Sequence, residues 1–191
     1  MVVISTGPVL LSLFGGVVAC WLLSLGRRIT WPRTVTVLAT SVYGASVMVV
    51  TALPPRLALR PGVHFESLLS LVNLVPLVTI DPRTFLLNVA MTVPLGLVLP
   101  LLVRVRSVTG AALAGLLVSA GIESAQGLAD LLFDLGRAVD VNDLAANTTG
   151  TVLGLLCLRL LAAVTGPTLT RFALPGSALT SPTDPVPGRA S

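Results

Sequence analysis

The sequence predicts an all-α membrane protein, a polytopic bundle of about five transmembrane helices plus one short re-entrant or interfacial helix. Composition gives the first reason. Hydrophobic residues make up 54% of the 191 residues and charged residues only 10%, whereas a soluble domain carries about 25% charged residues. The second reason is that the apolar residues fall into long runs. Since lipid offers no partners for open backbone groups, such runs are expected to cross the membrane as helices.

Five apolar runs are long enough to span the membrane, because a helix rises about 1.5 Å per residue and roughly 30 Å must be crossed. A sixth run, 68–80, is too short and suits a re-entrant or interfacial segment. Proline, serine, threonine and glycine dominate the C-terminal part, which predicts a membrane domain over 1–164 and a disordered tail over 165–191. The five predicted spans cover about 9–25, 35–53, 85–103, 108–128 and 144–164.

The arginines predict how the bundle is oriented. The connection between the first two spans holds Arg27, Arg28 and Arg33, and that between the third and fourth holds Arg104 and Arg106. Cytoplasmic loops carry an excess of basic residues, so both connections are expected inside the cell. We therefore predict a multi-pass protein of the cell membrane, with its N-terminus outside and its C-terminus in the cytoplasm.

Several classes of partner are not expected. The net charge of +4 comes from arginine alone, without a basic stripe or stacking aromatic residues, so nucleic acid is not predicted as a partner. The single histidine, His64, has no second metal-type donor near it in the sequence, and the two cysteines have no metal-ligand spacing. We predict no metal and no cofactor, and membrane lipids as partners; the oligomeric state is left open.

Polar residues interrupt the apolar pattern between residues 119 and 154. On the fourth span, Ser119, Glu123 and Gln126 stand at i, i+4 and i+7, which places them on one helical face. A charge at the centre of a bilayer costs roughly 2.5–3.5 kcal/mol even on permissive scales. This face is therefore expected to line the bundle interior or a wet cavity.

A second polar group lies at the start of the fifth span, where Asp140, Asp143 and Asn147 stand at i, i+3 and i+7. Asp140 or Asn142 could cap this helix, and acids near a helix N-terminus are favoured by its dipole, which would explain both aspartates without any chemistry. The nearest cation, Arg137, could bind a carboxylate or phosphate through two points, or pair with a neighbouring aspartate. Both interpretations stay open.

Two further patterns concern helix faces. Gly150 and Gly154 form a GxxxG spacing in an apolar helix, which lets two helices approach closely and so predicts a packing role. On the third span, Asn88 and Thr92 stand at i and i+4, so this helix also carries two polar residues on one face.

Taken together, these residues resemble the VanZ-like family of small bacterial membrane proteins. The similar segments are NLVP at Asn73–Pro76, NVAMTVPLG at Asn88–Gly96, SAGIESAQ at Ser119–Gln126 and GRAVDVNDLAANTTGTVLG at Gly136–Gly154. The resemblance covers a core of about 73–161, and departs from the family pattern at Met91–Val93, where the usual aromatic residue is missing. It implies one shared ligand-binding site made of Asn88, Glu123, Gln126, Arg137, Asp140, Asp143 and Asn147.

The family takes its name from an accessory protein linked to low-level resistance to the glycopeptide teicoplanin. The resemblance implies an integral protein of the bacterial envelope that contributes to such resistance through an outer-facing polar site. Its expected partner is a lipid-anchored cell-wall precursor or the glycopeptide itself.

Two alternatives stay open. The first is a membrane enzyme that acts on a lipid-linked envelope substrate, with Glu123, Asp140 and Asp143 as catalytic candidates. The sequence has no Ser-His pair, no HExxH motif and no ligand histidine, so a non-enzymatic role is favoured. The second alternative is a transporter in which Glu123 relays protons or ions.

Overall fold

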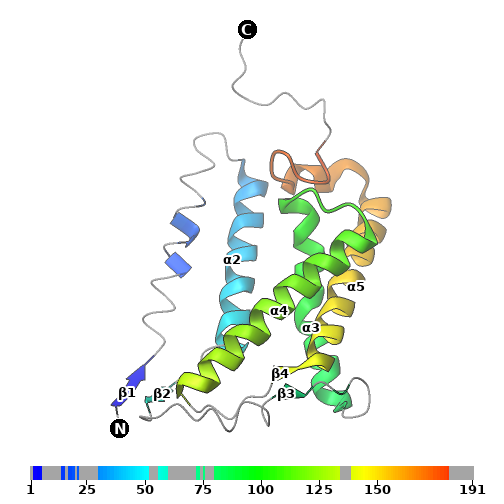
Figure 1. Cartoon of the computed structure of the whole chain (residues 1–191). Helices are drawn as coiled ribbons and strands as arrows, with labels where there is room; N and C mark the ends of the chain where they lie inside the picture. Colours follow the sequence, from blue (N-terminus) through cyan, green and yellow to red (C-terminus); the bar gives the residue numbers. More distant parts are fainter. Residues whose placement is uncertain are drawn as a thin grey trace.

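Helices running side by side form the body of the computed structural model (Figure 1). The structure describes residues 2–5, 14–15, 17–19, 21, 30–51, 56–59, 72–73, 75, 80–133 and 139–180. Among these residues are four long helices: α2 (Trp31–Thr51), α3 (Pro82–Leu102), α4 (Val108–Phe133) and α5 (Val141–Thr165). A 3-10 helix, η3 (Gly166–Phe172), follows α5.

Three stretches in the described part of the chain are helical, long and apolar enough to cross a membrane. They are Pro82–Leu102, Val108–Leu128 and Val141–Phe172, and they coincide with the third, fourth and fifth predicted spans. The second predicted span falls on α2, which has 21 residues. The first, 9–25, lies mostly outside the described residues. The predicted total of about five spans therefore stays a prediction.

In the described part of the chain, four short strands lie at one end of the bundle (Figure 1). In the first pair, β1 (Val2–Ser5) runs antiparallel to β2 (Arg56–Leu59). In the second pair, β3 (Val72–Asn73) runs parallel to β4 (Val139–Asp140), so segments distant in sequence meet just before α5 begins.

The second strand pair corrects one prediction. The short interfacial or re-entrant helix expected over 68–80 is wrong at Val72–Asn73, where the chain is an extended strand. Most of the remaining run lies outside the described residues. Asn73 stands opposite Asp140 in the ladder, and its Nδ2 donates to Oδ2 of Asp140 (3.1 Å). Pairing with a distant segment therefore takes the place of the helix expected from the length of this apolar run.

Helix α5 packs against both α3 and α4, and glycines bring α3 and α5 close together. A Cβ atom added to Gly154 would overlap the carbonyl oxygen of Val93 and lie 2.8 Å from the Cα of Gly96. One added to Gly150 would overlap the carbonyl oxygen of Val89. The GxxxG spacing thus lies in the contact between α3 and α5, as expected for a packing role.

The disordered tail predicted from residue 165 is wrong for residues 166–180, which we call the C-terminal cap. This segment forms η3 and then a series of turns, with Ala173, Leu174 and Ser177 buried. Gly166 ends α5 with a positive φ of 63°, a conformation that glycine adopts without strain. Residues 181–191 lie outside the described residues.

The C-terminal cap is ordered because its backbone N–H groups donate hydrogen bonds to the carbonyl oxygens at the end of α3. The last carbonyls of a helix have no partner within it. The N–H of Leu174 donates to the oxygen of Leu101 (2.7 Å), and the N–H of Ala178 donates to the oxygens of Pro100 (3.1 Å) and Val103 (3.0 Å). Composition alone predicted disorder because it does not show which backbone groups need a partner.

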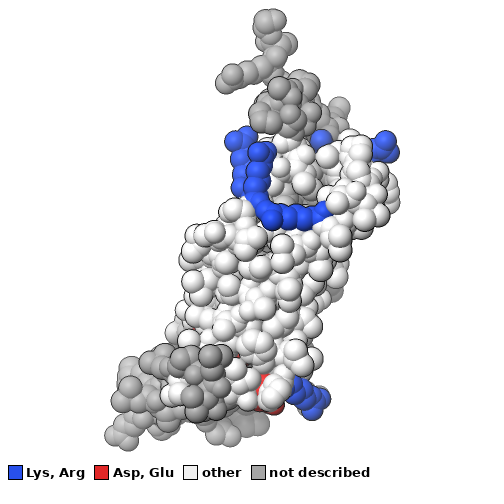
Figure 2. All heavy atoms as spheres, turned by 90° about the vertical axis from the view of Figure 1, so that its right-hand side faces the viewer, with Lys and Arg blue, Asp and Glu red and all other residues white. Residues whose placement is uncertain are grey.

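Charged side chains divide between the two ends of the bundle (Figure 2). What we call the arginine end lies where α2 and α4 begin and α3 and α5 end. It carries Arg33, Arg104, Arg106, Arg159 and Arg171. What we call the acidic end carries the described carboxylates Asp81, Glu123, Asp140 and Asp143, together with Arg83 in the first turn of α3.

Candidate functional site

Asp140 is the N-cap residue of α5. Its backbone is extended (φ −120°, ψ 122°), and its Oδ1 accepts hydrogen bonds from the backbone N (2.8 Å) and the Nδ2 (2.9 Å) of Asn142. Its Oδ2 accepts from Nδ2 of Asn73. Asp140, and not Asn142, is therefore the capping residue of this helix. Three N–H donors fix its carboxylate in one orientation.

Glu123, on α4, contacts the residue that caps α5. Its Oε2 accepts the backbone N–H of Asp140 (3.1 Å), and only 3% of the residue surface is exposed. One turn further into the bundle Ser119 is fully buried, and its Oγ accepts from Nδ2 of Asn147 on α5 (2.9 Å). Ser119 and Glu123 thus face the interior, as their spacing predicts. Gln126 is half-buried.

The hydrogen bond between Ser119 and Asn147 is expected to make a modest contribution to stability. Interhelical hydrogen bonds in membrane proteins contribute about 0.6 kcal/mol on average and about 1.7 kcal/mol at most. A double-mutant cycle of S119A and N147A, followed by unfolding in mixed micelles, should give a coupling within this range. S46A is the control, because the Ser46 hydroxyl donates to Val42 in its own helix. The prediction would be contradicted if the coupling energy between S46A and N147A equalled that between S119A and N147A.

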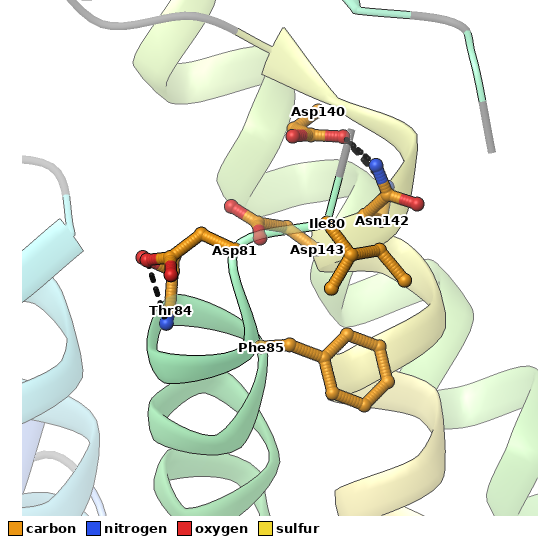
Figure 3. Close-up of a pocket in the computed structure, with 7 residues that line it drawn as sticks. All are labelled: Ile80, Asp81, Thr84, Phe85, Asp140, Asn142 and Asp143. Atoms are coloured by element: carbon orange, nitrogen blue, oxygen red, sulfur yellow. Dashed lines mark hydrogen bonds between the residues drawn. The ribbon is translucent and has the colours of Figure 1, made fainter. Parts of the chain in front are cut away.

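A small pocket lies between the N-termini of α3 and α5, and its volume is about 160 Å³. In Figure 3, Asp143 is drawn between Asp140 and Asp81, with the apolar side chains of Ile80 and Phe85 beside them. Drug-sized ligands occupy pockets of roughly 300–1,000 Å³. The pocket can therefore enclose one small polar group, but not a whole glycopeptide. Its lining residues are Ile80, Asp81, Thr84, Phe85, Asp140, Asn142 and Asp143.

The charged residues that line this pocket are all carboxylates. Asp81 caps α3, since it accepts from the hydroxyl of Thr84 (2.6 Å) and from the backbone N–H groups of Thr84 (3.1 Å) and Arg83 (3.3 Å). These hydrogen bonds, led by the Thr84 hydroxyl, hold the pKa of Asp81 below its usual value. The pocket is therefore suited to a cationic group.

The third helix contributes through Asn88, whose side chain lies within hydrogen-bonding reach of the half-buried Asp143. One turn further along α3, the hydroxyl of Thr92 donates to the backbone oxygen of Asn88 (2.9 Å). In the described part of the chain, no group of three or more His, Cys, Asp or Glu side chains is placed to hold a metal ion.

The structure brings most of the predicted site residues together near the acidic end, on three helices and at the end of β4. They are Asn88, Glu123, Asp140, Asp143 and Asn147. Arg137 lies outside the described residues. Sequence reasoning did not include Asn73 and Asp81 in the site. The NLVP segment, which contains Asn73, carried the signal for the first; the capping pattern Asp-Pro-Arg-Thr before α3 carried it for the second.

Comparison with known proteins supports the resemblance seen in the sequence. A family model described as VanZ/LLP1 matches residues 36–162, about two thirds of the chain. The match includes α3, α4, the part of the site described above, and all but the last residues of α5. Searches of the curated proteins and of the solved structures each returned no match. Since the family model covers well over half of the sequence, the chain belongs to the VanZ/LLP1 family.

Proposed function

We propose that this protein is a non-enzymatic protein of the bacterial cell envelope that binds a cationic group of a lipid-anchored cell-wall precursor, and so contributes to teicoplanin-type resistance. The observation that carries the proposal is the pocket between α3 and α5, whose charged lining residues Asp81, Asp140 and Asp143 are all acidic. A primary amine is the cationic group that suits it.

The orientation of the bundle supports this proposal. Basic residues are enriched on the cytoplasmic side of membrane proteins, so the arginine end is expected inside and the acidic end outside. The pocket would then face the compartment in which glycopeptides meet the peptide stems of cell-wall precursors. The N-terminus would lie outside and the C-terminus inside.

The size of the pocket agrees with recognition of one group and not of a whole ligand. A hydrogen bond to a charged group contributes about 1.5–3 kcal/mol. One ammonium group placed among the carboxylates would therefore give useful affinity, while the lipid anchor keeps the rest of the precursor in the membrane. Arg137, the expected partner of a phosphate or carboxylate on the same ligand, stays a prediction because it lies outside the described residues.

The test compares drug susceptibility in a knockout strain and in the same strain that expresses the wild-type chain. Expression should raise the inhibitory concentration of teicoplanin-type glycopeptides and leave that of cell-wall antibiotics with other targets unchanged. An equal shift for all cell-wall antibiotics would point to general envelope stress and contradict the proposal.

A membrane enzyme is the second candidate, and it is favoured over the transporter because the described carboxylates, the buried Glu123 included, gather at one end of the bundle and form no path across it. A carboxyl group in such a place could serve as a general acid or base. Turnover of a purified lipid-linked substrate by the wild-type chain, lost in E123Q, would support the enzyme. Absence of turnover in both chains, together with binding of the precursor, would favour the first proposal.

A further inference from the structure

We propose that the arginine end is a binding surface for the headgroups of anionic phospholipids in the adjoining membrane leaflet. The surface consists of Arg33, Arg104, Arg106, Arg159 and Arg171, held around the C-terminal cap. It lies at the opposite end of the bundle from the acidic pocket and does not depend on the function proposed for that pocket (Figure 2).

The positive charge at this end has no protein counter-charge among the described residues. All of the described carboxylates lie at the acidic end. Helix dipoles do not neutralise the arginines either. Two of the four long helices end here, α3 and α5, but the other two, α2 and α4, begin here, so their partial charges of about half a unit cancel. The charge must therefore be balanced by groups outside the described chain.

Backbone carbonyls hold four of these arginines in place, and one of the four is Arg159, whose Nη2 donates to the oxygen of Arg106. Each arginine uses one N–H for this contact, and a guanidinium group has five. The other contacts join Arg33 Nε to Ala173 O (3.0 Å), Arg104 Nε to Gly176 O (2.9 Å) and Arg106 Nη2 to Thr180 O (3.5 Å). Because a carbonyl is neutral, the full charge and most of the donors remain available. An oriented guanidinium group also loses less side-chain entropy when it binds a second partner.

The arginines lie at the depth of lipid headgroups. Helix α3 has 21 residues, which gives a length of about 32 Å and matches a hydrocarbon core of about 30 Å. Arg104 and Arg106 follow directly after its end. Trp31, at the start of α2 at the same end, is 75% exposed, and tryptophan is typical of the membrane–water interface.

Anionic phospholipid fits this surface better than a soluble anion does. The arginine fork matches two phosphate oxygens, and acyl chains find apolar side chains directly beside it. Leu160, Leu161 and Val164 follow Arg159 on α5, and all three are exposed. A phospholipid can therefore contact the charged and the apolar side chains together, whereas free phosphate can contact only the charged ones.

The experiment measures lipid binding to the purified full-length chain in neutral detergent by native mass spectrometry. The probes are short-chain phosphatidylglycerol, short-chain phosphatidylcholine and inorganic phosphate. We expect tight binding of phosphatidylglycerol alone. Each arginine near an anionic lipid surface contributes roughly fivefold in affinity, so R104Q/R106Q should bind it about 25-fold more weakly. The control R83Q, at the acidic end, should bind as the wild type does.

Three outcomes would overturn the proposal. One is equal phosphatidylglycerol binding by R104Q/R106Q and the wild type. Another is equal binding of phosphatidylcholine, and the last is competition by inorganic phosphate at the same concentration as the lipid. Glutamine at position 104 carries its Nε2 where arginine carries Nε and can still donate to the carbonyl of Gly176, and the backbone hydrogen bonds of Leu174 and Ala178 to the end of α3 are unchanged, so the C-terminal cap should persist. Should the variant not fold, salt tests the wild type directly: 0.5 M salt must release phosphatidylglycerol, and retained binding would refute the charge-based mechanism.

Discussion

Replacement of Gly154 by alanine is expected to destabilise the protein strongly, although it adds only one methyl group. The new Cβ would overlap the carbonyl oxygen of Val93 and lie 2.8 Å from the Cα of Gly96. These are backbone atoms, which cannot rotate away as a flexible side chain can, so α3 and α5 would have to separate. Overpacking typically costs about 1–3 kcal/mol, and the loss of neighbouring contacts between α3 and α5 places G154A at the upper end of that range.

The matched control is G121A on α4, because a Cβ added to Gly121 meets nothing within 4 Å. Alanine is a better helix former than glycine by about 0.8–1.0 kcal/mol, so G121A should be neutral or stabilising. The measurement is the free energy of unfolding of both variants in mixed micelles, relative to the wild type. We expect the free energy of unfolding to fall in G154A and to stay equal or rise in G121A. If G154A is as stable as the wild type, the helices α3 and α5 do not touch at Gly154.

The variant D143N is expected to remove glycopeptide protection while the protein stays inserted in the membrane. Asp143 is half-buried and lines the acidic pocket with Asp81 and Asp140. Asparagine has nearly the same shape but no charge, so it cannot form an ion pair with an ammonium group. Since a hydrogen bond to a charged group contributes about 1.5–3 kcal/mol, binding should weaken by roughly 10- to 150-fold.

The D143N measurement is the inhibitory concentration of teicoplanin in a knockout strain that expresses either the wild type or the variant, with the amount in the membrane fraction checked by immunoblot. T149V on α5 is the control, because Thr149 is exposed and its hydroxyl donates to Ala145 in its own helix. T149V should protect as the wild type does. Full protection by D143N at equal expression would exclude the acidic pocket as the site of action.

The helices were predictable from the sequence for a simple reason. An apolar run of about 20 residues has few alternatives in lipid, because a helix satisfies its backbone groups internally. The third, fourth and fifth spans therefore coincide with helices of the structure. The polar face of α4 was predictable for a related reason, since Ser119 and Glu123 stand one turn apart and both are buried.

The site was predictable only in part. Periodicity relates residues within one helix, so it placed Glu123 on one face and Asp140 near a helix start, but it could not pair the two. Their contact depends on how α4 meets the residue before α5. Asn73 is a clearer case, because its partner Asp140 lies 67 residues away and a parallel strand pair brings them together.

The sequence by itself determined that this is a helical membrane protein, and it located three helices that are long and apolar enough to cross a bilayer. These properties follow from local composition and spacing. Tertiary structure alone decided that residues 166–180 cap α3, that glycines bring α3 and α5 into contact, and that three aspartates surround one pocket. Each of these depends on backbone groups or side chains that are distant in the chain, and composition carries no information on such pairings.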